Sequence, residues 1–364
     1  MVSLQQMQAS NARINTLAPG LVAVFVGGTS GIGEATMKEF AKHASQPRIY
    51  FVGRSDEAAA RITIELESLN PGGQYNFIKA DISLLRNVDN VCLDIQSRES
   101  LINLLFLTSG TAVTGIDTAE SLHYHTAVTY YSRIRFISNL LPLLQRATSL
   151  RRVVTVFNNH SSKANNASAL HSHSIPSAPK TLLSQQSFAI MTLALESLAF
   201  EAPDVTFIHS FPSPFLPATS NNTPAEAPQK KSPKTSPLML VRSVFLKPVS
   251  TPQRPSSPPI SIIEAGERQL FIATSARYPA KRGGNVKLTA GVGIESEAGE
   301  QITVARGTDG EEGSGVYLIG HEGNGQSGNG TVAVLKELRE KDMVRRLWLH
   351  TVSEFTRITG SVFV

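Results

Sequence analysis

A glycine-rich turn near the N-terminus has the residues and the spacing needed to hold a phosphate group. Glycines stand at 27, 31 and 33, between an apolar run from Leu21 to Val26 and a helical pattern from Ile32 to His43. Gly27 can turn tightly out of a strand, Gly31 can let the backbone approach a diphosphate, and Gly33 can let the helix pack on the sheet. Because the N-terminal end of a helix attracts anions, we interpret this turn as an anion site rather than an ordinary tight turn.

A second position could determine whether such a site binds NAD or NADP. About 20 residues beyond the last glycine, an NAD site places an acidic residue on the ribose hydroxyls. Here that place is taken by Gly53, and Arg54 follows. An arginine fork can bind the 2′-phosphate of NADP through charge-assisted hydrogen bonds, so NADP is the expected cofactor. The alternative is an arginine that meets only solvent.

The order of the expected elements is that of an α/β fold, a doubly wound parallel sheet of the Rossmann type. Short apolar runs mark the expected strands, at 21–26, 48–52, 75–80, 102–107, 152–156 and 205–209. Helical periodicity marks the segments between them, at 32–43, 56–69, around 88–95, 121–146 and 184–200. Ser30 can accept a hydrogen bond from the first amides of the first helix. Strands that alternate with helices of this length form right-handed crossovers and a parallel sheet.

The C-terminal part departs from this alternation. Twelve of the twenty prolines lie between 212 and 259, which predicts a Pro/Ser/Lys-rich linker at 221–259. Residues 260–364 are expected to form an appendage that packs on the same sheet. The elements expected in it are a helix at 260–275, strands at 301–305 and 316–319, and a helix at 331–358 with a break near Asp342. Residues 1–20 are an expected lead-in, which leaves 21–220 as the nucleotide-binding domain.

Composition and charge argue against several classes of partner. With 41% hydrophobic and 17% charged residues, the chain has a soluble globular composition. The net charge of +5 arises in residues 221–290, which hold six Lys and five Arg against three Glu. Since no aromatic residues interleave with them to stack bases, we expect no nucleic-acid partner. No apolar run reaches about 18 residues and no signal-peptide core begins the chain, so we expect no membrane partner and a cytoplasmic location.

The glycine turn resembles that of the short-chain dehydrogenase/reductase family. That family carries Thr-Gly-x-x-x-Gly-Ile-Gly, and this chain differs in having Val26 in the place of the threonine. The resemblance covers residues 21–220 and, more loosely, the tail, where it is similar to a branch found in filamentous fungi. It implies that Asp81 contacts the adenine, unless it only caps a helix, and that Gly110 ends the cofactor wall. The expected cofactor-binding residues are Gly27, Thr29, Ser30, Gly31, Ile32, Gly33, Arg54, Ser55, Asp81, Ile82 and Gly110.

The resemblance fails at the catalytic residues. Family members use a tyrosine as proton donor, a lysine four residues later, a serine that polarises the carbonyl and an asparagine. The corresponding places hold Ser184, Phe188, Asn158 and, approximately, Thr129. The nucleotide half of the family pattern is present and the catalytic half is not, so we assign no catalytic residue.

Other side chains could supply chemistry in their place. Tyr131 and Arg135 lie one turn apart on the expected middle helix, and an adjacent cation can lower the pKa of a phenol. The alternative for Tyr131 is packing in the core. His160, His171 and His173 could suggest a metal site, but their spacing fits no common zinc pattern and no cysteine or nearby acid joins them. We therefore expect no bound metal.

The resemblance implies an NADP-linked oxidoreductase with an unusual proton donor. The branch it points to suggests a tailoring step on a small molecule in polyketide or terpenoid biosynthesis. Because the catalytic set is degenerate, two alternatives stay open: a redox-inactive cyclase or isomerase, and a cofactor-binding scaffold protein. Fold alone does not decide among them.

At neutral pH we expect the protein to reduce simple ketones and aldehydes far more slowly than family members with the complete catalytic set. A positioned general acid contributes about 10²- to 10⁴-fold, whereas hydride delivery by proximity needs none of the missing side chains. The measurement is NADPH consumption over a carbonyl panel, by the parent and by a variant that combines Ser184→Tyr, Phe188→Lys and Asn158→Ser. Robust turnover by the parent would show that another proton donor acts.

Overall fold

Seven strands form one sheet in which every neighbouring pair is parallel. The computed structural model describes residues 2–157, 187–212, 259–282, 291–292, 303–325 and 329–364. The strand order is β3-β2-β1-β4-β5-β6-β7. The strands are β1 (Val22–Val26), β2 (Arg48–Gly53), β3 (Gln74–Lys79), β4 (Leu104–Leu107), β5 (Arg152–Val156), β6 (Thr206–Phe211) and β7 (Val316–Gly320). This order confirms the doubly wound, Rossmann-type sheet expected from the sequence.

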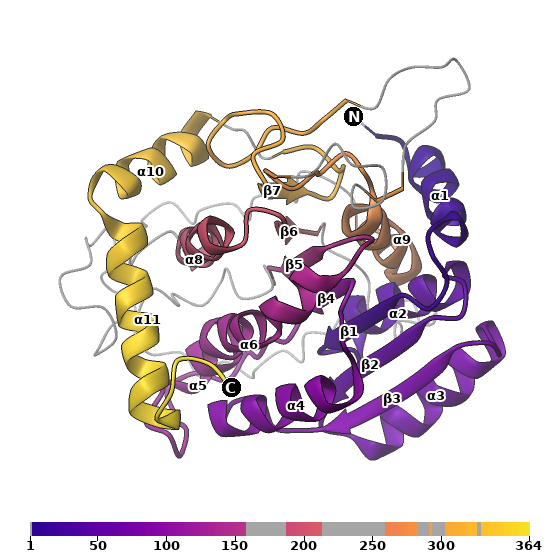
Figure 1. Cartoon of the computed structure of the whole chain (residues 1–364), viewed down its shortest axis with the longest axis horizontal. Helices are drawn as coiled ribbons and strands as arrows, with labels where there is room; N and C mark the ends of the chain where they lie inside the picture. The colour runs from indigo at the N-terminus through magenta and orange to yellow at the C-terminus, as the bar shows by residue number, and fades with distance from the viewer. Residues whose placement is uncertain (1, 158–186, 213–258, 283–290, 293–302, 326–328) are drawn as a thin grey trace, which may run out of the picture.

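Helices cover both faces of the sheet, as an all-parallel sheet requires. One face is covered by α1 (Leu4–Ala12), α2 (Gly31–His43), α3 (Asp56–Leu69) and α9 (Ile262–Thr274). The other is covered by α4 (Leu85–Arg98), α6 (Ser132–Arg146), α8 (Ser187–Glu201), α10 (Asn329–Glu340) and α11 (Met343–Thr359). Figure 1 shows α9 beside α2 and α1, and α11 beside α8 on the opposite side.

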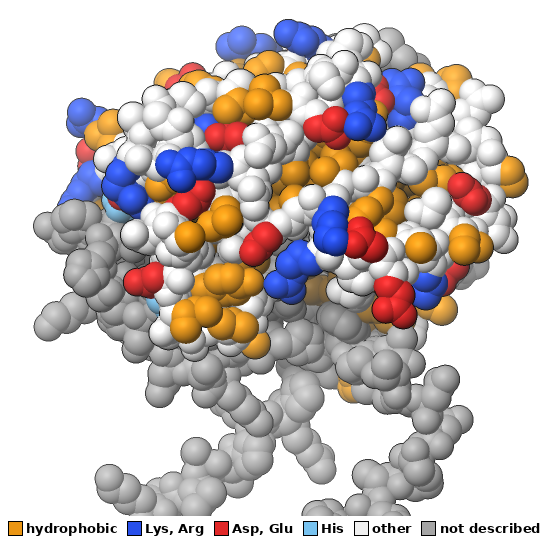
Figure 2. Space-filling view, turned by 90° about the horizontal axis from the view of Figure 1, so that it is seen from below, with side chains coloured by type: hydrophobic (Ala, Val, Ile, Leu, Met, Phe, Trp, Pro, Cys, Tyr) orange, Lys and Arg blue, Asp and Glu red, His pale blue; other side chains and the backbone are white. Residues whose placement is uncertain are grey.

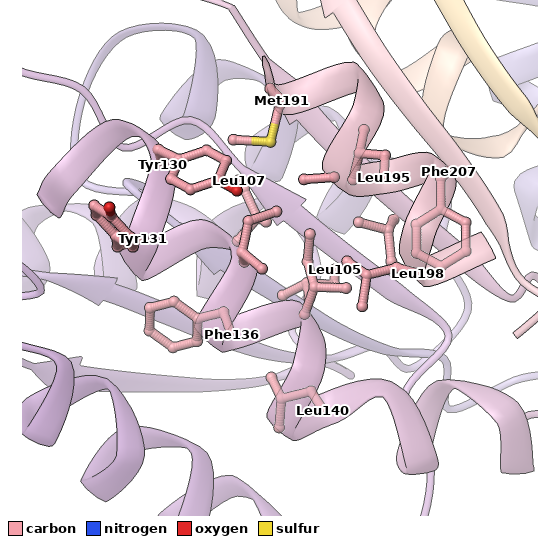
Figure 3. Packing of buried hydrophobic residues seen from close by; sticks show 14 of the residues in the cluster. Leu105, Leu107, Tyr130, Tyr131, Phe136, Leu140, Met191, Leu195, Leu198 and Phe207 are labelled. Carbon is pink, nitrogen blue, oxygen red and sulfur yellow. The ribbon is translucent and has the colours of Figure 1, made fainter. Parts of the chain in front are cut away.

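The strand side chains alternate between two apolar clusters, one on each face. Along β1, Val22, Val24 and Val26 pack toward α4, α6 and α8, whereas Ala23 and Phe25 pack toward α2. All five residues of β1 are buried, which explains its nearly continuous apolar sequence. Figure 3 shows the cluster on the α6 and α8 side, where Leu105 of β4 and Phe207 of β6 meet side chains such as Phe136 and Leu195.

The C-terminal part of the chain supplies elements of both helix layers and the last strand. β7 pairs with β6 from Phe207 to Phe211, and α9 lies against α2. The two helices approach so closely that a Cβ on Gly266 would lie 2.9 Å from the Cβ of Ala35. Glycine at this position therefore sets the distance between α9 and the helix that follows the glycine turn.

Two expected elements differ from the structure. Residues 303–305 form no strand, so the strand predicted at 301–305 is wrong in its described part. Ala305 instead donates to the carbonyl of Arg277, and the chain turns back through Gly310 and Gly313, both at positive φ. The predicted middle helix begins only at α5 (Tyr124–Thr126), because Ser121 has a φ of 61°.

The same middle helix contains a turn of π-helix, Ala127–Tyr131, before α6 begins.

The linker predicted at 221–259 lies outside the described residues except for its last position, and so do residues 184–186 of the helix predicted at 184–200. Among the residues that the structure describes, no helix combines the length and hydropathy needed to cross a bilayer. On the face seen from below, Figure 2 shows Lys and Arg side chains interspersed with Asp and Glu.

A buried ion pair joins three helices and the C-terminal end. Arg135 on α6 donates from Nε and Nη2 to the two carboxylate oxygens of Asp89 on α4, at 2.6 and 2.8 Å. Its Nη1 donates to the carbonyls of Ser361 and Val362, and its guanidinium lies 5.0 Å from the ring centroid of Phe355 on α11. The Arg135 side chain is fully buried, so this pair holds α11 in place on α4 and α6.

Replacing Asp89 by alanine is expected to destabilise the protein strongly. Removal of one partner leaves Arg135 as an uncompensated buried charge, which costs about 3–5 kcal/mol. The matched control is Asp94→Ala on the same helix, whose partner Arg98 is half exposed, and it should cost only about 0–1 kcal/mol. Urea unfolding measures both changes. Equal losses for the two variants would contradict the structural role given to the buried pair.

Candidate functional site

A cleft of about 240 Å³ lies at the carboxyl ends of the central strands. In an open parallel sheet, ligands bind where the strand order reverses, and here that point lies between β1 and β4. Of the eleven residues expected to contact a cofactor, all but Ser55 line this cleft. The structure thus brings together residues from positions 27 to 110 of the sequence at one site.

Close backbone contacts hold the glycine turn. Gly27 has a φ of 85° and donates from its amide to the carbonyl of Val52, at 3.1 Å. A Cβ on Gly33 would lie 2.3 Å from the Gly27 carbonyl oxygen, so only glycine lets α2 begin here. The Thr108 hydroxyl, at the end of β4, donates to the same Gly27 oxygen at 3.1 Å. The roles predicted for Gly27 and Gly33 agree with this geometry, whereas the contribution of Thr108 was not foreseen.

The N-terminus of α2 opens into the cleft. Ser30 is the N-cap residue, but its side chain makes no capping hydrogen bond, so the expectation that it would accept from the first amides is wrong. The first amides of a helix have no partner within the helix. Gly31 has a φ of 58°, and no atom of the described residues lies within 4 Å of the place where its Cβ would stand. The turn therefore offers amide donors and free space to an anion at the same point.

At the end of β2, the Thr29 side chain crowds the position where an NAD site would carry an acidic residue. A Cβ on Gly53 would lie 2.4 Å from Cγ2 of Thr29. Arg54 follows at the edge of the cleft, where it is exposed and donates to the Tyr124 hydroxyl at 3.4 Å. Ser55 lies outside the cleft lining, because its hydroxyl caps α3 by accepting from the amide of Ala58.

Asp81 lines the cleft without capping α4. Its carboxylate accepts from the amide of Ser83 at 3.0 Å, and the N-cap residue of α4 is Leu84. The cap comes from elsewhere: the buried carboxylate of Glu120 accepts from the amides of Leu85 and Arg86, at 2.6 and 3.1 Å. Since Glu120 lies about 35 residues away in sequence, no local pattern could indicate this role. Because Glu120 supplies the cap, the Asp81 side chain lines the cleft instead of capping α4.

A buried arginine lies beside the part of the cleft lined by Ser109 and Val156, which we call the inner end of the cleft. Arg133, on α6, donates to the carbonyl oxygens of Ser109 and Val156 and to the hydroxyl of Thr155, the last two at 2.8 and 2.6 Å. Burial lowers the pKa of Arg133 to about 10. On the neighbouring strand β6, burial and the charge of Arg133 lower the pKa of His209 to about 3. The histidine is therefore neutral at physiological pH, and its Nδ1 lies 3.0 Å from the Thr192 hydroxyl.

Tyr131 and Arg135, which were considered as substitutes for the missing catalytic residues, do not line the cleft. The Tyr131 hydroxyl is 2.9 Å from Nε2 of His350 on α11, and Tyr131 is not part of the cleft lining. Arg135 is paired with Asp89, so the interpretation of Tyr131 and Arg135 as a catalytic pair is wrong. Thr129, which stands near the place of the family asparagine, donates from its hydroxyl to the carbonyl of His125.

A Tyr-x-x-x-Lys spacing occurs in this chain on an edge strand. Tyr75 and Lys79 belong to β3, where the Tyr75 hydroxyl donates to the Asn70 carbonyl and Lys79 contacts Asp56. The spacing there has no relation to the cleft. The places of the family serine and tyrosine, at 158 and 184, lie outside the described residues, as do the side chain of Phe188 and the three histidines at 160, 171 and 173. In the described parts of the chain, no group of three metal-ligating side chains occurs.

A parallel sheet with a glycine turn at its switch point defines a protein of the Rossmann class. A family model described as short chain dehydrogenase matches residues 6–168. Oxidoreductase AN1596 of Emericella nidulans is 38% identical over 361 residues, which cover 97% of this chain and 98% of that protein. Oxidoreductase andH of Emericella variicolor is 33% identical, over 99% of both chains.

A third relative carries the family name. Short-chain dehydrogenase/reductase SAT2 of Stachybotrys chartarum is 26% identical over 374 residues, which cover 97% of this chain and 96% of that protein. With nearly full-length relatives of this kind and the family model over the first strands, the chain belongs to the short-chain dehydrogenase/reductase family.

Alanine at Gly31 and at Gly33, two of the glycines of the turn, should separate stability from ligand binding. Gly33→Ala forces the new methyl group against the Gly27 carbonyl, so we expect a loss of about 1–3 kcal/mol in the free energy of unfolding. Gly31→Ala meets no atom but adopts a left-handed conformation, at a cost of about 1–2 kcal/mol, and its methyl group stands in the cleft. Chemical unfolding and calorimetric titration with NADPH measure the two effects. A Gly31→Ala protein that binds as tightly as the parent would contradict this assignment of the cleft.

Proposed function

We propose that the protein is an NADP(H)-linked oxidoreductase whose cofactor site is the cleft at the glycine turn. The observation that carries this proposal is the end of β2. Thr29 fills the space beside Gly53, where an acidic residue of an NAD site would stand, and Arg54 follows at the edge of the cleft. In the described structure no carboxylate lies within 4.0 Å of Arg54, whose hydrogen bond is to the Tyr124 hydroxyl, so its charge is not neutralised and can attract a phosphate.

The cleft residues fit the parts of a dinucleotide in order. The first amides of α2 and the space at Gly31 would hold the diphosphate, and Arg54 would hold the 2′-phosphate. Asp81 and Ile82 would border the adenine. The remaining part of the lining, from Ser109 to Val156, would receive the nicotinamide end. When bound, the nicotinamide would accept or donate a hydride.

The proposed role is a tailoring step in the biosynthesis of a fungal polyketide or terpenoid, with a small-molecule substrate. Support comes from full-length relatives in fungi whose names say oxidoreductase. The fungal branch that the sequence resembles points in the same direction. We propose a cytoplasmic location for the same reasons of composition given above, with neither nucleic acid nor membrane as partner.

A second candidate is a redox-inactive protein that uses the same cleft for a cyclisation or an isomerisation, or as a scaffold. It is favoured by the position of Tyr131, which contacts His350 on α11 instead of the cleft. Under this candidate the dinucleotide would still bind, but no hydride would be transferred. Binding measurements thus test the cofactor site, and turnover measurements test the choice between the two candidates.

Arg54→Ala should weaken NADPH binding about ten- to a hundred-fold and leave NADH binding little changed. The reason is that a hydrogen bond to a charged group contributes about 1.5–3 kcal/mol, and only NADPH carries the 2′-phosphate. Nicotinamide fluorescence titration measures both affinities. Arg98→Ala, an exposed arginine at the end of α4, is the matched control and should change neither. Equal losses for the two cofactors would refute the role given to Arg54.

A further inference from the structure

Arg133 is a buried cation to which the described structure gives no acidic partner. The residue is 3% exposed, and among the described Asp and Glu residues no carboxylate oxygen lies within 4.0 Å of its guanidinium. Its neighbour on the same helix shows the usual arrangement: Arg135 is equally buried but is held by both oxygens of Asp89. Buried charges are normally paired, so the charge of Arg133 needs another explanation.

The hydrogen bonds of Arg133 place its charge next to the backbone that lines the inner end of the cleft. Its acceptors include the carbonyl oxygens of Ser109 and Val156, and both of these residues line the cleft. The guanidinium therefore links the ends of β4 and β5. Among the described residues its Nε has no hydrogen-bond partner.

Among the residues that the structure describes, no acidic side chain pairs with this charge. Burial and the charge of Arg133 together keep His209 neutral, and among the described residues its buried Nε2 has no hydrogen-bond partner. His125, on α5, also has its pKa lowered, first by burial and then by the charges of His123 and Arg133. Of the described groups at this end of the cleft, Arg133 therefore supplies a positive charge, and a charge in a protein interior acts more strongly than it does in water.

We infer that Arg133 makes the inner end of the cleft discriminate against cationic ligands, and that the protein therefore binds NADPH more tightly than NADP⁺. The inference rests on the proposed function, which assigns this end of the cleft to the nicotinamide. The oxidised nicotinamide ring carries a positive charge, whereas the reduced ring is neutral. The two forms share the diphosphate, the adenosine and the 2′-phosphate, so those contacts contribute equally to both affinities.

Such a preference has a kinetic consequence for this chain. The reduced cofactor would leave the site more slowly than the oxidised one, because differences in affinity between closely related ligands arise mostly in the dissociation rate. Arg133 is a positioning residue in this account: it contacts the backbone that lines the cleft and acts on the ligand through its charge.

The test compares dissociation constants of NADPH, NADP⁺ and 2′-phospho-ADP-ribose, measured by calorimetry on the full chain. We expect the parent to bind NADPH roughly 5- to 30-fold more tightly than NADP⁺. Arg133→Gln removes the charge, and the ratio should fall toward about one. Arg133→Lys keeps the charge and should keep the preference. Arg54→Ala should weaken all three ligands together and leave the ratio unchanged.

The outcomes separate this inference from the proposed function. Equal affinities of the parent for NADPH and NADP⁺ would overturn the inference alone, and this measurement decides even if neither Arg133 variant folds. An unchanged ratio in Arg133→Gln would overturn it as well. If the parent bound none of the three nucleotides, the proposed function would be wrong and the inference would fall with it.

Discussion

The parallel sheet can exist only with both faces covered, and this constraint organises the whole chain. Every residue of β1, β4, β5 and β7 is buried, so neither face of the sheet centre can meet solvent. One cover comes from α2 and α9, which lie about 230 residues apart in sequence, and the other includes α11 near the C-terminal end. The C-terminal segments thus complete the same core that the N-terminal strands begin.

Local patterns were sufficient for the features that depend on neighbouring residues. The apolar run before Gly27 predicted β1, and the glycine spacing predicted a turn into α2, because both depend on backbone space and on side-chain periodicity. The cleft collects ten of the eleven expected residues for the same reason, since parallel strands all end at one edge of a sheet. Ser55 is the exception: its position after a strand fits a ligand contact and a helix cap equally well, and the structure shows the cap.

Features that depend on distant partners could not be read from the sequence. Glu120 caps α4, Thr108 holds the Gly27 carbonyl, and Arg133 joins the ends of β4 and β5, and each contact joins residues at least 22 positions apart. The spacing of one turn between Tyr131 and Arg135 suggested that the two could act together, yet Asp89, 46 positions away, binds Arg135. Charge pairing inside a core is decided by tertiary packing, and sequence spacing on one helix is a poor guide to it.

The close contact between Gly266 and Ala35 also has a consequence for how the chain is made. The ribosome produces about 5–20 residues each second, so the α2 surface that will receive α9 waits about 10–50 seconds before α9 is synthesised. During that time the surface of α2 that contacts α9 in the finished fold lacks this partner, while the strands β2 to β6 are synthesised. Transiently exposed apolar surface promotes aggregation, so a slower emergence of α9 would lower the yield of native protein before any property of the finished fold came into play.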